Sequence, residues 1–162
     1  GEAPGRYEDE QGVPFVGRAG RLLDSLLESI GLDRSEVFVT NMLKCRPPKN
    51  RDPLPDELKA CGPYLNKQIE LINPKIIVTL GRFSFAWFFP NIPIGEARGK
   101  PIDLENGTVV YPMYHPAAAL RNGKIRQKAE QDFLNLQKII ANPTTKVPKA
   151  ANDTKETQMR MF

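Results

Sequence analysis

Residues 76–81 read Ile-Ile-Val-Thr-Leu-Gly, a continuous apolar run that ends at a glycine. Its length and its β-branched side chains favour a strand that is covered on both faces over a helix. Strands of this kind occur in parallel sheets whose two faces carry helices. This stretch therefore predicts an α/β domain, and the segments on either side of it support that interpretation.

Helical and strand-like patterns alternate along the rest of the chain. Leu and Ile residues at helical spacing predict a helix over 18–30, followed by Gly31 as the glycine that ends it. Further helices are expected over 55–72, 82–89 and about 125–141, strands over 37–40 and 108–114, and a hairpin within the Pro- and Gly-rich stretch 90–107. The order predicts a three-layer α/β/α sandwich around a central, mainly parallel four-stranded sheet.

The first strand of this sheet is expected upstream of the printed chain. The opening residues Gly1-Glu2-Ala3-Pro4-Gly5 have the composition of a turn that follows a strand. From Pro143 onward the sequence has little apolar mass and no periodicity. We therefore predict one domain over 1–142, truncated at its N-terminus, and a disordered tail over 143–162.

Composition narrows the possible functions. The 162 residues are 40% hydrophobic and 26% charged, as in an ordinary globular domain, and no apolar run reaches the 18 residues of a membrane span. A net charge of +4 allows an anionic partner such as nucleic acid. Two cysteines and one histidine are too few for a disulfide framework or a multi-His metal site.

Several polar residues follow the expected strands, where ligands bind in open α/β sheets. They are the acidic opening turn, Asn41, the segment after Gly81, and His115. Each has an ordinary structural interpretation: a solvated acidic loop, a turn cap at Asn41, and a structural histidine before a proline. Phe15 would ordinarily belong to the core, and no single one of these residues establishes a function.

Four segments taken together carry a family resemblance. They are Gly1-Glu2-Ala3-Pro4-Gly5-x-x-Glu8-Asp9, Pro14-Phe15-Val16-Gly17-Arg18-Ala19-Gly20, Thr40-Asn41-Met42-Leu43-Lys44-Cys45-Arg46-Pro47-Pro48, and His115-Pro116-Ala117-Ala118-Ala119-Leu120-Arg121. In this order, and up to about Ile140, the chain resembles the family 4 (thermostable, iron–sulfur) uracil-DNA glycosylases. The resemblance implies hydrolysis of the N-glycosidic bond of deoxyuridine in DNA, after the base has been flipped out of the duplex. The products would be uracil and an abasic site, as in base excision repair.

The resemblance also implies roles for individual residues. Phe15 would stack on uracil, and the Asn41 amide would accept from N3–H and donate to O4. His115 would donate a hydrogen bond to O2 of the departing uracil anion. The turn that approaches the base closely would comprise Gly1, Ala3 and Gly5.

Two acids complete the implied site. Glu2 and Glu8 are the candidates to orient the attacking water or to stabilise the cationic sugar. Better-known uracil glycosylases have an aspartate where this chain has Ala3, and a tyrosine that excludes thymine where it has Gly5. We therefore hypothesise that Glu8 blocks the C5 methyl group of thymine.

A basic segment follows His115 and is predicted to grip DNA. Its cations would neutralise phosphates, and Leu120 or Arg121 would enter the gap left by the flipped base. The alternative is a solvated helix start, although helix starts usually favour acids. A second basic run covers 44–51. The predicted DNA-binding residues are Leu120, Arg121, Lys124, Arg126 and Lys128.

Cys45 and Cys61, taken alone, would be interpreted as free thiols. The resemblance instead implies a structural [4Fe–4S] cluster in the intact protein, with two further cysteines upstream in a C-x-x-C pattern. A disulfide is disfavoured because the expected compartment, the cytoplasm, is reducing. The chain end, Gln158-Met159-Arg160-Met161-Phe162, resembles a truncated sliding-clamp-binding peptide, with a random apolar end as the alternative.

Two other functions were weighed. A non-catalytic nucleic-acid-binding module on the same fold is disfavoured by the presence of Asn41 and His115. A broader glycosylase acting on hypoxanthine or other deaminated bases is disfavoured because a purine would not fit the amide pairing of Asn41. No lysine stands out as a Schiff-base nucleophile, so lyase activity is not expected. We expect a monomer without a membrane partner.

Overall fold

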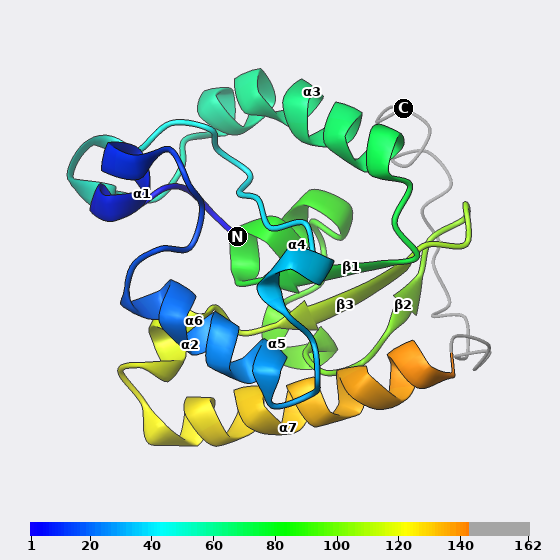
Figure 1. Ribbon diagram of the computed structural model, residues 1–162. Helices are drawn as coiled ribbons and strands as arrows, with labels where there is room; N and C mark the ends of the chain where they lie inside the picture. The colour runs from blue at the N-terminus through cyan, green and yellow to red at the C-terminus, as the bar shows by residue number, and fades with distance from the viewer. Residues whose placement is uncertain (143–162) are drawn as a thin grey trace.

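A computed structural model describes residues 1–142, and the tail predicted over 143–162 lies outside the described residues. Helix α3 lies on one side of a small sheet, and α2 and α7 lie on the other (Figure 1). The helices are α1 (Arg6–Gln11), α2 (Arg18–Glu28), α3 (Pro55–Ile72), α4 (Arg82–Phe88), α5 (Ile94–Ala97), α6 (Pro116–Ala119) and α7 (Gly123–Ala141). The strands are β1 (Ile76–Leu80), β2 (Ile102–Asp103) and β3 (Val109–Met113).

The sheet has the strand order β1-β3-β2. β1 runs parallel to β3, with Ile76 opposite Val109 and Leu80 opposite Met113. β2 is antiparallel to β3 and forms a hairpin with it, which reaches beyond the 90–107 stretch in which a hairpin was expected. The mixed α/β class and the parallel strand at 76–80 are therefore confirmed, although only Thr79 and Leu80 of that strand are buried and the described residues contribute three strands rather than four.

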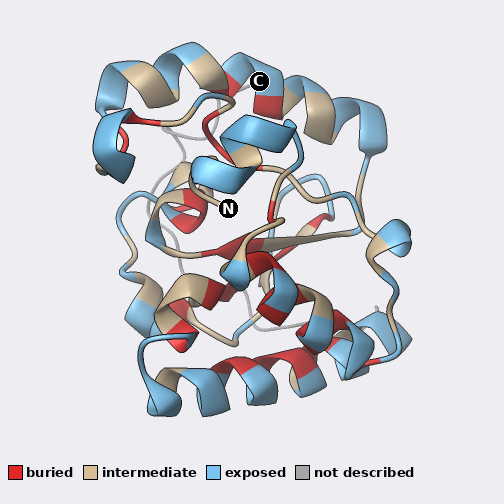
Figure 2. Cartoon of the chain, turned by 60° about the vertical axis from the view of Figure 1, so that its left-hand side comes forward, coloured by how far each residue is buried: buried red, intermediate tan, exposed pale blue. Residues whose placement is uncertain are grey.

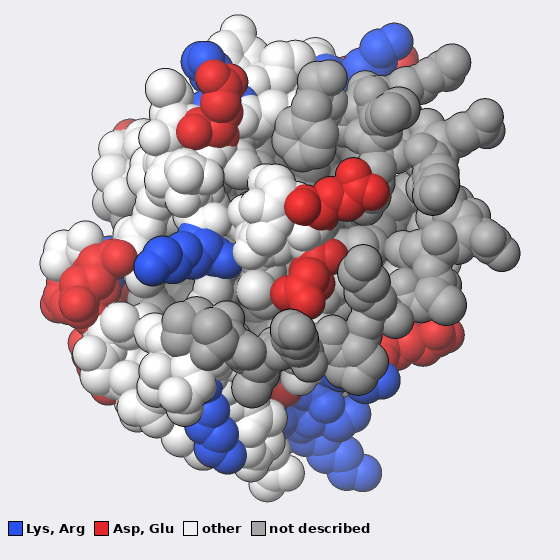
Figure 3. Space-filling model, turned by 90° about the vertical axis from the view of Figure 1, so that its right-hand side faces the viewer, with Lys and Arg blue, Asp and Glu red and all other residues white. Residues whose placement is uncertain are grey.

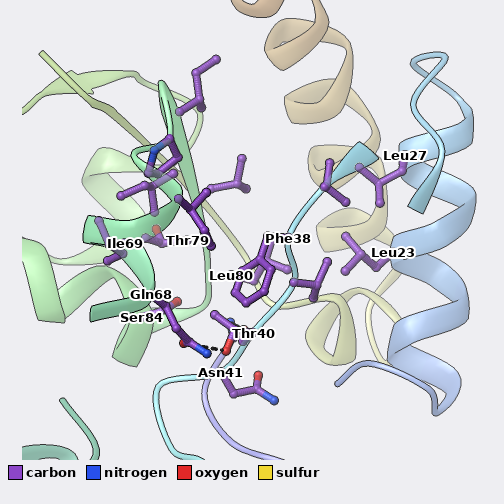
Figure 4. A pocket seen from close by; sticks show the side chains of 18 of the residues that line it. Leu23, Leu27, Phe38, Thr40, Asn41, Gln68, Ile69, Thr79, Leu80 and Ser84 are labelled. Atoms are coloured by element: carbon purple, nitrogen blue, oxygen red, sulfur yellow. Dashed lines mark hydrogen bonds between the residues drawn. The ribbon is translucent and has the colours of Figure 1, made fainter. Parts of the chain in front are cut away.

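The strand predicted at 37–40 was wrong, because this segment is extended but joins no strand ladder. Its end pairs instead with the opening residues: the Gly1 amine donates to the Thr40 carbonyl at 2.8 Å, and the Met42 N–H donates to the Gly1 carbonyl at 3.0 Å. An apolar groove of about 380 Å³ is lined both by this segment and by β1 (Figure 4). The strand expected before Gly1 stays a prediction.

Two hydrophobic cores cover the two faces of the sheet. Val110 packs with Phe85 and Phe89 on one face. Tyr111 and Met113 pack on the other face with the leucines of α2 and with apolar residues of α7. In Figure 2 the buried stripes of the helices face inward and their exposed stripes face solvent. This arrangement confirms the three-layer sandwich, in which each fully buried large apolar side chain contributes about 1.5–3 kcal/mol.

The helix boundaries follow local signals in the sequence. α3 spans the predicted 55–72, with Glu57 of its first turn accepting from the Leu54 N–H at 2.9 Å. Gly31 has φ 77°, the left-handed conformation expected of a glycine that ends a helix. The short α1 buries no residue, so it leaves no hydrophobic pattern in the sequence and was not predicted. No helix within residues 1–142 is both long enough and apolar enough to cross a membrane.

A buried ion pair ties α7 to the segment after α5. Asp132 is only 2% exposed and accepts a hydrogen bond from Arg98. The Tyr111 hydroxyl donates to the Asp132 carbonyl at 3.1 Å. Burial raises the pKa of Asp132, and the Arg98 guanidinium opposes that shift. The ion pair stabilises the contact between α7 and the sheet only while both Arg98 and Asp132 are present.

We therefore expect Arg98→Ala to lower the free energy of unfolding by about 3–5 kcal/mol, because it leaves a buried carboxylate without its partner. Urea denaturation measures this. Arg126→Ala is the matched control, because Arg126 pairs with Glu130 on the exposed side of the same helix; its expected effect is at most about 1 kcal/mol. Equal losses in the two variants would contradict the prediction.

Candidate functional site

A pocket of about 230 Å³ gathers residues from four separate segments of the chain. It lies beyond the carboxyl ends of the parallel strands, since His115 closely follows β3 and lies against Gly81, which follows β1. The opening turn with α1, the segment around Phe15, the stretch from Asn41 to Arg51, and the start of α6 all contribute. The predicted residues that line it are Glu2, Ala3, Gly5, Glu8, Phe15, Asn41 and His115.

Gly1 lies beside this pocket, at a point where a side chain would not fit. A Cβ atom on Gly1 would lie 2.4 Å from Asn41 Oδ1 and 2.6 Å from Phe15 Cζ. Both distances are below any real carbon contact, so only glycine lets the backbone pass between these two side chains. The opening turn therefore packs closely against Asn41 and Phe15, while its expected approach to the base stays a prediction.

The larger apolar groove offers little chemistry. In Figure 4, Leu23 and Leu27 of α2 lie on one side of it, and Ile69 of α3 with Thr79 of β1 on the other. Glu36 is the one ionisable side chain among the residues that line it. Asn41 is shared by the groove and the smaller pocket, but the acids and the histidine belong to the smaller pocket, which is therefore the candidate site.

His115 is held as a neutral imidazole with a defined proton position. Its Nδ1 accepts a hydrogen bond from the Ala117 N–H at 3.1 Å, which leaves the proton of the neutral ring on Nε2. Burial lowers the pKa of His115 from 6.5 to about 4, while Glu8 opposes the shift. At neutral pH the ring can therefore donate one hydrogen bond from Nε2 without carrying a charge.

The rings of Phe15 and His115 stack, with centroids 5.5 Å apart and planes 24° from parallel. Asn41 is 6% exposed, and its Oδ1 accepts no hydrogen bond from the described residues. Buried amide oxygens are nearly always paired, so this acceptor is suited to a ligand that brings its own N–H donor. An aromatic face and an unpaired amide oxygen together suit a planar, hydrogen-bonding ligand.

Lys44 holds the backbone of Asn41 in place, a role that sequence reasoning missed. Its Nζ donates to the Asn41 carbonyl at 2.8 Å, to Thr40 Oγ1 at 2.9 Å and to Gln68 Oε1 at 2.7 Å. The lysine is thus turned inward and does not add to a basic surface over 44–51. Only the tertiary contact with Gln68 of α3 distinguishes it from a surface lysine.

The loop over 44–51 also forms one wall of the pocket, which the sequence did not indicate. Pro47, Asn50 and Arg51 line the pocket wall. Arg51 is held there by Glu57 of α3, with guanidinium-to-carboxylate contacts of 2.6 and 2.8 Å. No local motif marks this contact, because it depends on how the loop returns over the opening turn.

The two acids of the pocket differ in their surroundings. Burial and then Asp52 raise the pKa of Glu2, while Arg82 and the Gly1 amine oppose the shift. Partial burial would raise the pKa of Glu8, but backbone N–H groups of Gly17, Glu8, Val16 and Gly5 outweigh it and lower that pKa. Glu8 is therefore held as a carboxylate, whereas Glu2 protonates more readily.

The predicted DNA-binding residues follow the pocket along α6 and the start of α7. Leu120 is 37% exposed, and all the basic members of the set are exposed. Lys128 also lies over the ring of Tyr114, at 5.9 Å from its centroid. The face in Figure 3, seen from the side away from α1 and α6, shows acidic and basic side chains interspersed rather than one continuous basic patch.

The described residues offer two thiols for a metal group. Cys45 is free and exposed, and Cys61 in α3 is free and half-buried. Within residues 1–142 no group of three or more His, Cys, Asp or Glu is placed to hold a metal ion. A four-iron cluster needs four thiolates, so these residues do not by themselves fit one. The predicted clamp-binding peptide at 158–162 lies outside the described residues.

Comparison with known proteins identifies the family to which the chain belongs. Residues 1–137 match the uracil DNA glycosylase superfamily. A type-4 uracil-DNA glycosylase of Sulfurisphaera tokodaii is 49% identical over 152 residues, which cover 88% of this chain and 69% of that protein. The type-4 enzyme of Archaeoglobus fulgidus is 46% identical (86% and 74% covered), and that of Thermotoga maritima is 49% identical (86% and 75% covered). The chain belongs to the type-4 family of the uracil-DNA glycosylase superfamily.

Proposed function

We propose that this protein is a DNA repair glycosylase that hydrolyses the N-glycosidic bond of deoxyuridine in DNA. It releases uracil and leaves an abasic site. The observation that carries the proposal is one pocket that combines the stacked ring of Phe15, the unpaired Oδ1 of Asn41 and a neutral His115. The names of its relatives, uracil-DNA glycosylases at 46–49% identity, support the same substrate.

The pocket recognises a base that has been flipped out of the DNA. Asn41 Oδ1 accepts from uracil N3–H and its amide donates to O4, whereas cytosine presents the opposite pattern at these two atoms. Phe15 supplies the aromatic face on which the base stacks. Outside the pocket, Arg121, Lys124, Arg126 and Lys128 bind phosphates, and exposed Leu120 or Arg121 enters the gap left by the flipped base.

Catalysis stabilises charge on both parts of the breaking bond. His115 Nε2 donates to O2 as negative charge develops on the departing uracil. Glu2 and Glu8, the two acids of the pocket, orient the attacking water and stabilise the cationic sugar.

Glu8 also supports the hypothesis of thymine exclusion. A Cβ atom on Gly5 would lie 2.7 Å from Glu8 Oε2, so this carboxylate occupies the space of a side chain at position 5. Position 5 is where better-known uracil glycosylases carry the tyrosine that excludes thymine. Thymine excision by a Glu8→Ala variant tests the hypothesis; no gain, with uracil activity retained, would refute it.

We also propose that the intact protein holds an iron–sulfur cluster and that its chain end binds a sliding clamp. Cys45 and Cys61 would supply two of the four thiolates of a structural [4Fe–4S] cluster, next to the loop that closes the pocket. A protein that is colourless and free of iron after anaerobic isolation would contradict this. Loss of clamp capture on deletion of residues 158–162 would support binding through the chain end.

Matched duplex oligonucleotides containing uracil, hypoxanthine or thymine test the proposed substrate, with alkali cleavage at abasic sites as the readout. We expect excision of uracil alone. Asn41→Asp should lower the rate of uracil excision about 5- to 150-fold, because a mispaired buried group costs about 1–3 kcal/mol, and it should admit cytosine.

Asn106→Asp is the matched control, because this exposed residue lies in the β2–β3 hairpin before β3 begins, whereas the pocket lies beyond the other end of that strand. DNA binding without excision by the wild-type protein would show a binding module instead of an enzyme. Equal activity of Asn41→Asp and the control would show that Asn41 does not recognise the base.

The neutral state of His115 is directly measurable, because it is the single histidine of the chain. We expect its NMR resonance to titrate with a midpoint near pH 4 and to stay unchanged between pH 6 and 8. The folded pKa lies below the ordinary value of 6.5, so the linked stability is complete above about pH 6.5 and is lost as the pH falls toward 4. A midpoint near 6.5 would contradict burial of the neutral ring.

A further inference from the structure

Phe15 is held in a backbone conformation that a bulky residue rarely adopts. Its φ is 56°, in the left-handed region. Its side chain is buried, with 6% exposed. The segment also presses against α2, because a Cβ atom on Gly20 would lie 1.7 Å from the Phe15 carbonyl oxygen. Such a conformation costs of order 1–3 kcal/mol and persists only where surrounding contacts impose it.

Two of the contacts that hold this segment come from Glu8. Glu8 Oε1 accepts from the Val16 N–H at 3.0 Å and from the Gly17 N–H at 2.9 Å, the two residues directly after Phe15. Gly17 is the residue before the first turn of α2, which has no side-chain cap and no acid of its own. The carboxylate of α1 therefore binds the N–H of Gly17, the N-cap residue of α2, and the N–H of Val16 just before it.

The other side of the same segment is held independently. Arg34 Nη2 donates to the Pro14 carbonyl at 2.7 Å, and Arg34 is itself paired with Asp24 of α2. Phe15 is thus anchored on both sides: Arg34 holds the Pro14 carbonyl before it, and Glu8 holds the N–H groups of the two residues after it. Removing one anchor frees one side of the loop.

We propose that Glu8 is a positioning residue: its carboxylate joins α1 to the start of α2 and thereby holds the Phe15 ring against His115 at the wall of the base pocket. Glu8 thus holds Phe15 in addition to supplying negative charge. The inference rests on the proposed function only in taking this pocket to bind a base. The ionised state of Glu8, favoured by its backbone donors, keeps it an acceptor at neutral pH.

The first test needs no catalysis, because the resonances of the single histidine report the ring stacked against it. We expect Phe15→Ala to shift them, Glu8→Ala to shift them in the same direction, and Glu8→Gln to leave them near the wild-type position. A Gln side chain still offers Oε1 to both N–H groups. Glu10→Ala is the matched control, since Glu10 pairs with exposed Arg6 on the same short helix.

The second test is a double-mutant cycle on uracil excision. Glu8→Ala and Phe15→Ala should each raise KM about tenfold, as expected for loss of about 1.4 kcal/mol of base binding. The double variant should be no worse in KM than Phe15→Ala alone, because Glu8 acts through Phe15. Glu8→Gln should restore KM while kcat stays lowered, since the conservative variant keeps the acceptor and loses the charge.

The two tests separate the two proposals. If the wild-type protein releases no uracil but the histidine shifts follow the expected pattern, the proposed function fails and the positioning role stands. Glu8→Ala with wild-type histidine resonances would overturn the positioning role. So would Glu8→Gln with the shifts of Glu8→Ala, or additive effects on KM in the double variant.

Discussion

The backbone pairing between the opening residues and the 40–43 segment is the contact on which the pocket depends. The Gly1 amine, the Met42 N–H and the Leu43 N–H make three hydrogen bonds across it, at 2.8, 3.0 and 2.9 Å. This pairing brings Glu2 and Asn41 to the same cavity. It also requires glycine at position 1, because any side chain there would collide with Asn41 and Phe15.

Burial then sets the protonation states that the chemistry needs. His115 is neutral because its ring is removed from water, and its proton lies on Nε2 because Nδ1 accepts from the helix that follows. Glu8 stays ionised in the same pocket because backbone donors surround its carboxylate. A neutral donor and a carboxylate fixed by backbone donors therefore lie in one pocket at neutral pH.

Prediction from sequence succeeded where a local pattern carried the information. The long helix over 55–72 and the buried strand over 76–80 are marked by their own spacing and composition, and both were found in place. The segment 37–40 has the composition of a strand but pairs with the opening turn, because strand pairing depends on a distant partner. Helix α1 was missed because it buries no residue and therefore leaves no hydrophobic pattern in the sequence.

The sequence by itself determined the fold class, the family and seven of the residues that line the pocket, since the family and these residues rest on motifs that are contiguous along the chain. The tertiary structure alone decided how these residues act. Lys44 turns inward to hold Asn41, Glu57 of α3 holds Arg51 at the pocket wall, and Glu8 anchors the loop that carries Phe15. Hydrogen-bond partners and burial depend on contacts between segments far apart in the chain, and no local pattern encodes such contacts.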